Sequence, residues 1–434
     1  MTQLSSAAPI AAACPASGIG GDYRAFDHEG MYAFMQRARR EEPVFFCPEI
    51  GYWVVTRRAD ILPIFRDPDR FSASIALTPV KPLPQRIIDF LGENGYRAEA
   101  TQVSCDRPRH TRIRDYAMRV LNVREYTRLQ PQVHDVIRRC CDALEGRDRV
   151  DMIADFAYDL PALVIFLILG IPDEDTPKIK KWADNRLLFT FGELDDAAQQ
   201  HAAEQMLDYW KYCVAMVEDR KRSPRDDYAS KLLAMRDGDD SRLTENEIAS
   251  LVFGLLLAGH ETTTNMTGNA LRALLTHRKQ WERICRDPSL IPNAVEECLR
   301  FESSVVCWRR RALVDVEVAG VSIPKGSNLL LALGSANHDE AHFTDPEVLD
   351  VTRTNAREHV SFGNGIHFCL GGALARIELC LILEELTRRW PDMRRVDEPI
   401  EMVRTIAFRG PLRLNVELHS AAPLATTRAP GSVA

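Results

Sequence analysis

The stretch Phe362-Gly-Asn-Gly-Ile-His-Phe-Cys-Leu-Gly-Gly372 decides how this chain is interpreted. It is a glycine-rich loop with a single cysteine, Cys369, and apolar residues at helical spacing follow it: Leu370, Leu374, Ile377 and Leu381. Gly363 and Gly365 let the backbone take positive φ and lie close against a flat ligand. A helix N-terminus stabilises negative charge through its dipole and free N–H groups. The sequence therefore predicts that Cys369 favours its thiolate form.

A lone cysteine near the start of a helix is more often a small buried hydrophobe than a ligand. Here the whole pattern Phe-Gly-x-Gly-x-His-x-Cys-x-Gly is present, and a caged thiolate suits an axial ligand of haem iron. The loop resembles the cysteine-ligand loop of the cytochrome P450 haem-thiolate monooxygenases. The resemblance implies that haem b is held by Cys369 and contacted by Phe362 and Gly363, with His367 bonded to a propionate. It also implies a mainly α (α+β) fold, in which a large helical domain and a smaller β-rich region hold haem between distal and proximal helices.

Composition excludes several classes of protein. The 434 residues are 45% hydrophobic and 27% charged, as in ordinary globular proteins. The net charge of −7 gives no global support for binding nucleic acid. None of the eleven cysteines forms a Cys-x-x-Cys pair, which favours a reducing, cytoplasmic location. The longest apolar runs, 162–171 and 251–258, are too short to cross a membrane, so no membrane partner is expected.

The chain shows no repeat and no long linker, so we expect one catalytic domain over residues 21–420. Residues 1–20 and 421–434 are expected to be flexible tails. Alternating apolar residues around turn signals predict β-hairpins over 42–57 and 314–323.

A second stretch, Leu251 to Asn265, changes abruptly from an apolar helix to Ala258-Gly-His-Glu-Thr262. Apolar residues on every side predict a helix buried nearly all round. A buried acid beside an alcohol is costly unless it has a function, and a capped helix break is disfavoured because helical patterning resumes afterwards. The stretch resembles the family's distal helix. The resemblance implies that Ala258 and Gly259 lie at the haem, that Thr262 bonds the dioxygen and that Glu261 belongs to the proton relay.

Three basic residues are candidates for the haem propionates. His110 and Arg114 share one face of a predicted helix, which suits an anionic group, although a solvated charged face is the simpler reading of the pair alone. The resemblance assigns His110 and Arg114 to a propionate. It assigns Arg310 likewise, although the run Arg309-Arg-Arg311 leaves that choice open by one residue.

Glu297 and Arg300 are neighbours on a predicted helix, and on a surface such a pair would contribute little. Their place before the cysteine loop matches the family's Glu-x-x-Arg pair. The resemblance implies that the pair is buried and braces the loop, with Arg353 as its third member.

The substrate pocket is expected to draw on several separate segments. Residues 71–105 contain closely spaced prolines and are expected to be irregular, and a loop this long is often functional. Residues 186–194 could form part of a mobile lid. The candidate pocket residues are Ile75, Leu77, Phe189, Val305, Val306 and Ile406.

These residues together predict a monooxygenase that uses O2 and a small hydrophobic substrate. Because we recognise no flavin domain or iron–sulfur pattern in the sequence, the electrons of NAD(P)H are expected to arrive through a separate ferredoxin or reductase. Arg112 and Arg376 are candidate docking residues. Three local phrases, at 41–46, 291–300 and 335–343, are similar to a bacterial branch that is often fused to a phthalate-dioxygenase-type reductase. Members of that branch hydroxylate or dealkylate small aromatic compounds.

Two other readings stay open. One is a peroxygenase driven by hydrogen peroxide, a kind of enzyme that usually lacks the Glu-Thr pair. The other is a haem-binding sensor or carrier without turnover, which the buried acid and alcohol disfavour.

Overall fold

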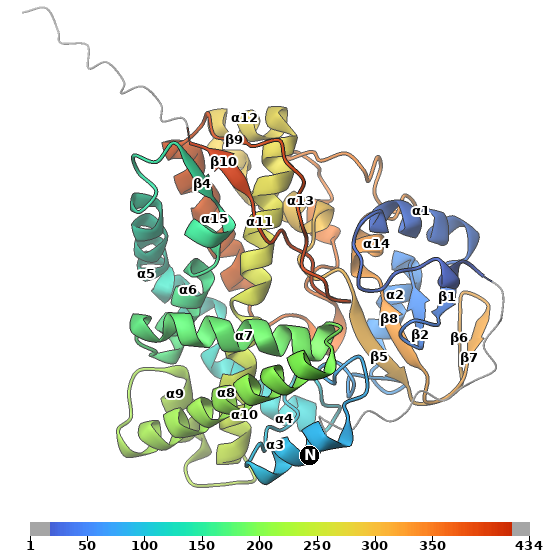
Figure 1. Cartoon of the computed structure of the whole chain (residues 1–434), viewed down its shortest axis with the longest axis vertical. Coiled ribbons are helices and arrows are strands. Elements are labelled where there is room, and N and C mark those ends of the chain that lie inside the picture. Colours follow the sequence, from blue (N-terminus) through green and yellow to red (C-terminus); the bar gives the residue numbers. More distant parts are fainter. Residues whose placement is uncertain (1–17, 419–434) are drawn as a thin grey trace, which may run out of the picture.

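The computed structural model describes residues 18–418, and most of this part is helical (Figure 1). Residues 1–17 and 419–434 lie outside the described residues, and they include most of the predicted tail 1–20 and all of the predicted tail 421–434. The longer helices are α1 Met31–Glu41, α2 Arg58–Arg66, α3 Gln85–Glu93, α4 Arg109–Val120, α5 Val123–Asp142, α6 Leu160–Leu169, α7 Thr176–Phe191, α8 Asp196–Arg222, α9 Tyr228–Arg236, α10 Glu245–Ala258, α11 Glu261–Thr276, α12 Arg278–Arg286, α13 Ile291–Phe301, α14 Leu333–Asn337 and α15 Gly372–Arg389.

Short helical turns link these helices. The 3-10 turns are η1 Ile19–Gly21, η3 Asp173–Asp175, η4 Pro288–Leu290, η5 Ala356–Glu358 and η6 Gly365–His367, and η2 Ile153–Ala157 is a π-helical turn. Ile19 lies in the stretch expected to be a tail, but its backbone N–H donates to Glu42.

Local sequence explains where several helices begin. The side chain of Thr244 accepts from the backbone of Glu247, and Glu247 bonds back to Thr244, so α10 starts at a capping box. Asn122, Asp195 and Asp227 cap α5, α8 and α9 in the same way through a side-chain oxygen. These caps satisfy backbone donors that helix formation leaves unpaired.

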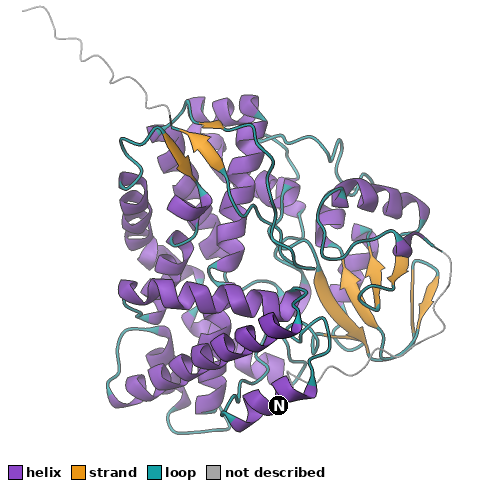
Figure 2. Ribbon diagram, viewed as in Figure 1, coloured by secondary structure: helices purple, strands orange, loops and turns teal. Residues whose placement is uncertain are grey.

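Most of the strands form a sheet region beside the helices, whereas β4, β9 and β10 form a separate sheet among the helices at the upper left (Figure 2). They are β1 Val44–Cys47, β2 Tyr52–Val55, β3 Phe71–Ser72, β4 Arg149–Asp151, β5 Trp308–Ala312, β6 Val316–Val318, β7 Val321–Ile323, β8 Asn328–Leu331, β9 Arg394–Arg395 and β10 Asn415–Glu417. The main sheet has the order β1-β2-β8-β5-β3, with β2 and β8 parallel. Both predicted hairpins are confirmed, because β1 pairs with β2 and β6 with β7.

The expectation that 71–105 is irregular was wrong in part. Phe71 and Ser72 form β3 against β5, and Gln85–Glu93 form α3. Ile87 and Leu91 on α3 are fully buried. The prolines end before α3 begins, with Pro84 at its N-cap, where a missing N–H costs little.

The packing of the helices places the cysteine loop. α15 packs against α5 and α13, and α13 packs against α11. The loop before α15 also contacts α2, since η6 lies against that helix. The cysteine loop therefore lies where the helical part meets the sheet region. Among residues 18–418, no helix is both long and apolar enough to span a bilayer.

Candidate active site

The cysteine loop is folded back on itself. The backbone N–H of Cys369 donates to the carbonyl of Phe362 over 3.0 Å. Gly365 has a φ of 71°, and a β-carbon there would lie 2.3 Å from the carbonyl oxygen of Phe65, so only glycine fits. Cys369 is exposed as a residue, although the protein atoms around its sulfur still desolvate the thiol, and α15 begins three residues later at Gly372.

The surroundings of Cys369 act on the pKa of its thiol in two directions. Desolvation raises the pKa of the Cys369 thiol, although the backbone N–H groups of Gly371 and Gly372 and the charges of Arg114 and Arg376 act in the opposite direction. The helix start contributes as expected, but burial outweighs it.

A group of buried donors without acceptors lies beside this loop. The rings of His110 and His367 lie 4.3 Å apart. Neither ring nitrogen of His110, nor Nε2 of His367, nor Nη2 of Arg310 has a hydrogen-bond partner in the described structure. Arg114 lies beside them and donates to the carbonyl of Phe368 over 2.7 Å. Unpaired buried donors are costly, so this cluster fits an anionic ligand such as the haem propionates.

Both histidines of the cluster are neutral at physiological pH. Burial and then Arg114 lower the pKa of His110 to about 4. Burial, then Arg310 and His110, lower the pKa of His367 to about 3. A neutral imidazole carries one N–H, which His110 can donate to a carboxylate. In His367 the Nδ1 N–H donates to the carbonyl of Gln102 over 2.9 Å, so its Nε2 can donate to a propionate only when the ring is protonated, which the negative charge of a propionate favours.

Strand alternation separates the three adjacent arginines. On β5, Arg310 is paired with Leu329, and its guanidinium lies 5.1 Å from the ring centre of Phe65, the residue whose carbonyl approaches Gly365 of the cysteine loop. Arg309 points to the other face and donates to the carbonyls of Ala76 and Thr78. The alternation favours Arg310 as the arginine beside His367, in line with the sequence prediction.

The distal helix is interrupted at the predicted motif. α10 ends at Ala258 and α11 begins at Glu261, so the expected single helix is two. A β-carbon at Gly259 would lie 2.4 Å from the side chain of Ile165, which explains the glycine by a close approach of α6. The hydroxyl of Thr262 donates to the carbonyl of Ala258 over 2.9 Å.

One face of this interrupted helix is open, although its neighbours are buried. Ala258 is exposed and Gly254, Leu255, Gly259 and Thr262 are half-buried. Residues four apart share a helix face, so these positions form one accessible stripe. Thr262 lies on that stripe.

Glu261 points away from this accessible face into a buried ion cluster. Its Oε1 lies 2.7 Å from Nζ of Lys180 and 2.9 Å from Nε2 of His260. Burial opposes the charge of the carboxylate, but Lys180 and then His260 outweigh it and hold the pKa of Glu261 at about 2. Lys180 and His260 were not given a role from the sequence. Lys180 is one of several lysines on an amphipathic helix, and no pattern marks it.

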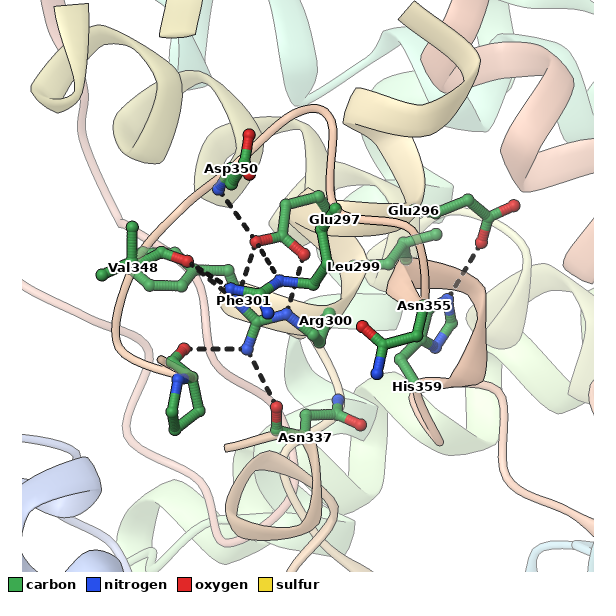
Figure 3. A network of polar contacts seen from close by, with 12 residues as sticks. Glu296, Glu297, Leu299, Arg300, Phe301, Asn337, Val348, Asp350, Asn355 and His359 are labelled. Carbon is green, nitrogen blue, oxygen red and sulfur yellow. Dashed lines mark hydrogen bonds and ion pairs between the residues drawn. The ribbon is translucent and has the colours of Figure 1, made fainter. Parts of the chain in front are cut away.

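The brace expected around Arg300 is buried (Figure 3). Arg300 donates twice to Glu297 over 2.8 Å and also to the carbonyl of Asn337 over 3.0 Å. Arg353 donates to Glu297 over 3.1 Å, and so does the backbone N–H of Asp350 over 3.0 Å. The network ties α13 to the segment before the cysteine loop.

A second network lies beside the first and was not foreseen. Glu296 accepts from His359 over 3.1 Å and from Arg376 over 2.7 Å. The guanidinium of Arg376 lies 4.6 Å from the ring centre of Phe362, whose carbonyl holds Cys369. Its signal in the sequence is only a second glutamate next to Glu297.

The predicted docking residues are already engaged. Arg112 pairs with the buried carboxylate of Glu247 over 2.7 Å, and Arg376 pairs with Glu296. Neither guanidinium is a free surface charge, which removes the basis for choosing these two as the contacts of a redox partner.

The candidate pocket residues come together in part. The backbone N–H of Ile406 donates to the carbonyl of Phe191, and Val305 pairs with Phe408, whose ring lies 4.9 Å from that of Phe191. Ile75, Phe189, Val306 and Ile406 are buried, and Leu77 and Val305 are half-buried. The end of α7 is fixed to the 71–105 segment by a bond from Val80 N–H to the Thr190 carbonyl.

Comparison with known proteins gives a consistent result. The Cytochrome P450 family model matches residues 107–287 and 288–397. Cytochrome P450 CYP107DY1 of Priestia megaterium is 34% identical over 355 residues, which is 81% of this chain and 85% of that protein.

Solved structures are similar over nearly the whole chain. Cytochrome P450 CREJ in complex with (4-ethylphenyl) dihydrogen phosphate is 38% identical, with a TM-score of 0.89 over 92% of this chain and 100% of that one. Full-length CYP116B46 from Tepidiphilus thermophilus is 35% identical, with a TM-score of 0.89 over 92% of this chain and 54% of that longer one.

Proposed function

Because the chain belongs to the cytochrome P450 family, and is therefore a haem-thiolate monooxygenase, we propose that it hydroxylates or oxidatively dealkylates a small hydrophobic, aromatic substrate. The family uses haem b with a cysteine thiolate ligand, O2 and electrons from NAD(P)H that arrive through a redox partner. The observation that carries the proposal is the pairing of an accessible Cys369 with a cluster of buried donors that lack acceptors.

The residues that would hold the haem come from both sides of the cysteine loop. Cys369 would supply the thiolate. The propionates would be acceptors for the nitrogens of His110, His367 and Arg310 that have no partner in the described residues. Arg114 would fix the loop through the Phe368 carbonyl. Haem bound through a thiolate supplies iron that activates O2, because electron donation by sulfur favours O–O cleavage.

The distal residues would control the proton supply. The Thr262 hydroxyl bonds to the Ala258 carbonyl and lies on the accessible face, where it would orient a proton donor. Glu261 is charged at neutral pH, so it would pass a proton rather than store one, and the Lys180 ammonium beside it would be the source. Ile165 packs closely at Gly259 and would help to exclude water from this region.

Three observations support the substrate class. The candidate pocket is apolar and aromatic, with Phe191, Phe408 and Trp308 close together. A 38%-identical structure binds an aryl phosphate, (4-ethylphenyl) dihydrogen phosphate. The branch resemblance seen in the sequence agrees with the 35%-identical CYP116B46. We infer a separate ferredoxin or reductase as the electron source, and a cytoplasmic location, supported by ten free cysteines in the described residues.

The experiment combines a spectrum with an assay. The purified holoprotein is reduced under carbon monoxide, and the expected Soret band is that of a thiolate-ligated haem. Consumption of NADH with a ferredoxin, its reductase and a 4-alkylphenyl substrate should then give an oxygenated product. An imidazole-type band would contradict the proposed ligand.

The same assay separates the alternatives. Product formed with hydrogen peroxide alone, and none with NADH and partners, would identify a peroxygenase. Gas binding without any product would identify a sensor or carrier. The Glu261–Thr262 pair on the distal helix favours the monooxygenase over both.

A further inference from the structure

Buried arginines and lysines in this protein divide into two groups. In the described residues, five pair with a carboxylate: Arg39 with Glu340, Lys180 with Glu261, Arg220 with Asp227, Arg300 with Glu297 and Arg409 with Glu302. Three others are buried without an ion pair in that part of the chain: Arg186, Arg309 and Arg310. A buried charge without a counter-ion is strongly unfavourable, so each of the three needs an explanation.

Arg310 and Arg309 each have partners that account for their burial. Arg310 lies beside His367, where a haem propionate would meet it. Arg309 links two segments, since Nη1 donates to Thr78 and Nη2 to Ala76 over 2.7 and 2.8 Å. Its guanidinium also lies 5.0 Å from the centre of the Phe191 ring. Arg309 is thus held by backbone acceptors. Only the burial of Arg186 is left without partners that account for it among the described residues.

Arg186, on α7, has a single backbone acceptor. Its Nη1 donates to the Phe253 carbonyl on α10, and its guanidinium lies 3.6 Å from the centre of the Phe253 ring. No other hydrogen bond or ion pair engages this guanidinium in residues 18–418. Most of the donor fork is therefore available to a ligand.

The surroundings of Arg186 are aromatic and rich in donors. The rings of Tyr96, Tyr209 and Trp210 lie 6.1, 5.2 and 5.7 Å from that of Phe253. The hydroxyl of Tyr209 is fully enclosed and has no hydrogen-bond partner in the described structure. Burial raises the pKa of Tyr96 to about 12 and that of Tyr209 further, so both hydroxyls keep their protons. Tyr96 and Tyr209 lie within electrostatic range of the Arg186 guanidinium. Cationic N–H and phenolic O–H donors in aromatic surroundings suit anionic oxygens.

We propose that Arg186, Tyr209 and Tyr96 bind the anionic end, a phosphate monoester or carboxylate, of the small aromatic substrate. The inference rests on the proposed function and narrows its substrate class. It predicts where the substrate is oxidised, because α10 and α11 connect the receptor to the distal alcohol. Phe253 lies on α10 and Thr262 at the start of α11, so the receptor and the distal alcohol are separated along these two consecutive helices. Oxidation is expected at the end of the substrate remote from the anion.

The test uses the ferric holoenzyme and three probes of similar shape. These are 4-ethylphenyl phosphate, 4-ethylbenzoate and the neutral 4-ethylphenol, and binding is followed by the substrate-induced spin-state change of the haem. At least one anionic probe should bind roughly 10-fold or more tightly than the neutral probe, as expected for hydrogen bonds to a charged group. The two anionic probes distinguish a phosphate from a carboxylate receptor. Inorganic phosphate should compete with the anionic probes only.

Variants connect this preference to the receptor. Arg186→Gln should weaken the binding of the preferred anionic probe roughly 10- to 100-fold. The affinity for 4-ethylphenol should stay within about threefold of that of the wild type. Arg186→Lys should retain part of the preference. Tyr209→Phe removes only a hydroxyl and should weaken the binding of the anionic probes roughly 3- to 10-fold. This second variant tests the receptor even if Arg186→Gln fails to fold.

Two outcomes would overturn the receptor. One is equal binding of the three probes by the wild type. The other is that Arg186→Gln weakens the binding of charged and neutral probes equally, while Tyr209→Phe weakens the binding of neither. Arg186 would then contribute only packing. A thiolate-type ferrous-carbonyl band in the same preparation shows that the proposed haem ligation holds independently of either result.

Discussion

At the scale of single residues, the charge of the Glu261 carboxylate depends strongly on two neighbouring side chains. Its carboxylate is buried and charged only because Lys180 and His260 surround it. In Lys180→Met the charge loses its main counter-ion, so the pKa of Glu261 should rise towards neutrality. Removing one partner of a buried pair should cost about 3–5 kcal/mol of stability. Chemical denaturation of the holoprotein measures that loss, and an unchanged midpoint would show that the pair is not coupled.

The same residue sets an acid limit on stability. The pKa of Glu261 is about 2 in the folded protein, below its ordinary value, so the folded state holds the proton less well than the unfolded state. The stabilisation is therefore complete above the unfolded pKa and is lost as the pH falls towards 2. Glu261→Gln should flatten the stability profile below pH 5 or so and slow NADH-driven turnover roughly 100-fold or more. A profile that keeps its full acid slope would contradict this role.

Cys369 can be tested by a change of one atom. Cys369→Ser keeps the size of the side chain but removes the thiolate, so haem-bound protein should lose the thiolate-type carbonyl band and its turnover. Cys285→Ser, at a half-buried cysteine far along the chain, is the matched control and should keep both. Retention of the native spectrum in Cys369→Ser would assign the ligand elsewhere.

At the scale of elements, α13 connects the helical part to the cysteine loop through Glu297. Glu297→Gln would leave Arg300 buried with a weakened partner, because Arg300 and Arg353 both donate to this carboxylate. We expect a loss of about 3–5 kcal/mol and poor haem retention. Glu282→Gln, which removes a surface pair on α12, should change stability by less than about 1 kcal/mol. Equal effects of the two substitutions would mean that the network is not a brace.

At the scale of the whole molecule, the accessible side of the cysteine loop is where electrons are expected to enter. Phe368 and Val123 are large apolar residues that are 42% and 63% exposed, and Tyr126 on α5 bonds to the loop at Leu370. Arg66 and Arg124 are exposed cations beside this region, and no ion pair engages them among residues 18–418. They replace Arg112 and Arg376 as the docking prediction, a choice set by the folded structure.

Reversing these two charges should impair electron transfer, and at Arg66 it also removes a hydrogen bond to Asn364 of the cysteine loop. Arg66→Glu with Arg124→Glu is expected to slow reduction by an acidic ferredoxin at least roughly 10-fold at low salt, and the difference should shrink as salt rises. Stopped-flow reduction under carbon monoxide measures it. Arg112→Glu serves as the comparison, since it should destabilise α4 against α10 through Glu247. No change in rate or in salt dependence would place docking elsewhere.

The sequence by itself determined the family, the mainly helical fold with a small sheet, and the order of the cysteine loop, distal motif and Glu-x-x-Arg pair. These features depend on local chemistry: glycines beside a cysteine, an acid and alcohol in an apolar helix, and alternation in the hairpins. Only the tertiary structure decided that Lys180 meets Glu261, that Arg310 rather than Arg309 lies beside His367, and that Arg186 meets no carboxylate among residues 18–418. The reason is that the stability and role of a buried charge depend on partners that are distant in the sequence. The periodicity of residues within one helix or strand does not specify those partners.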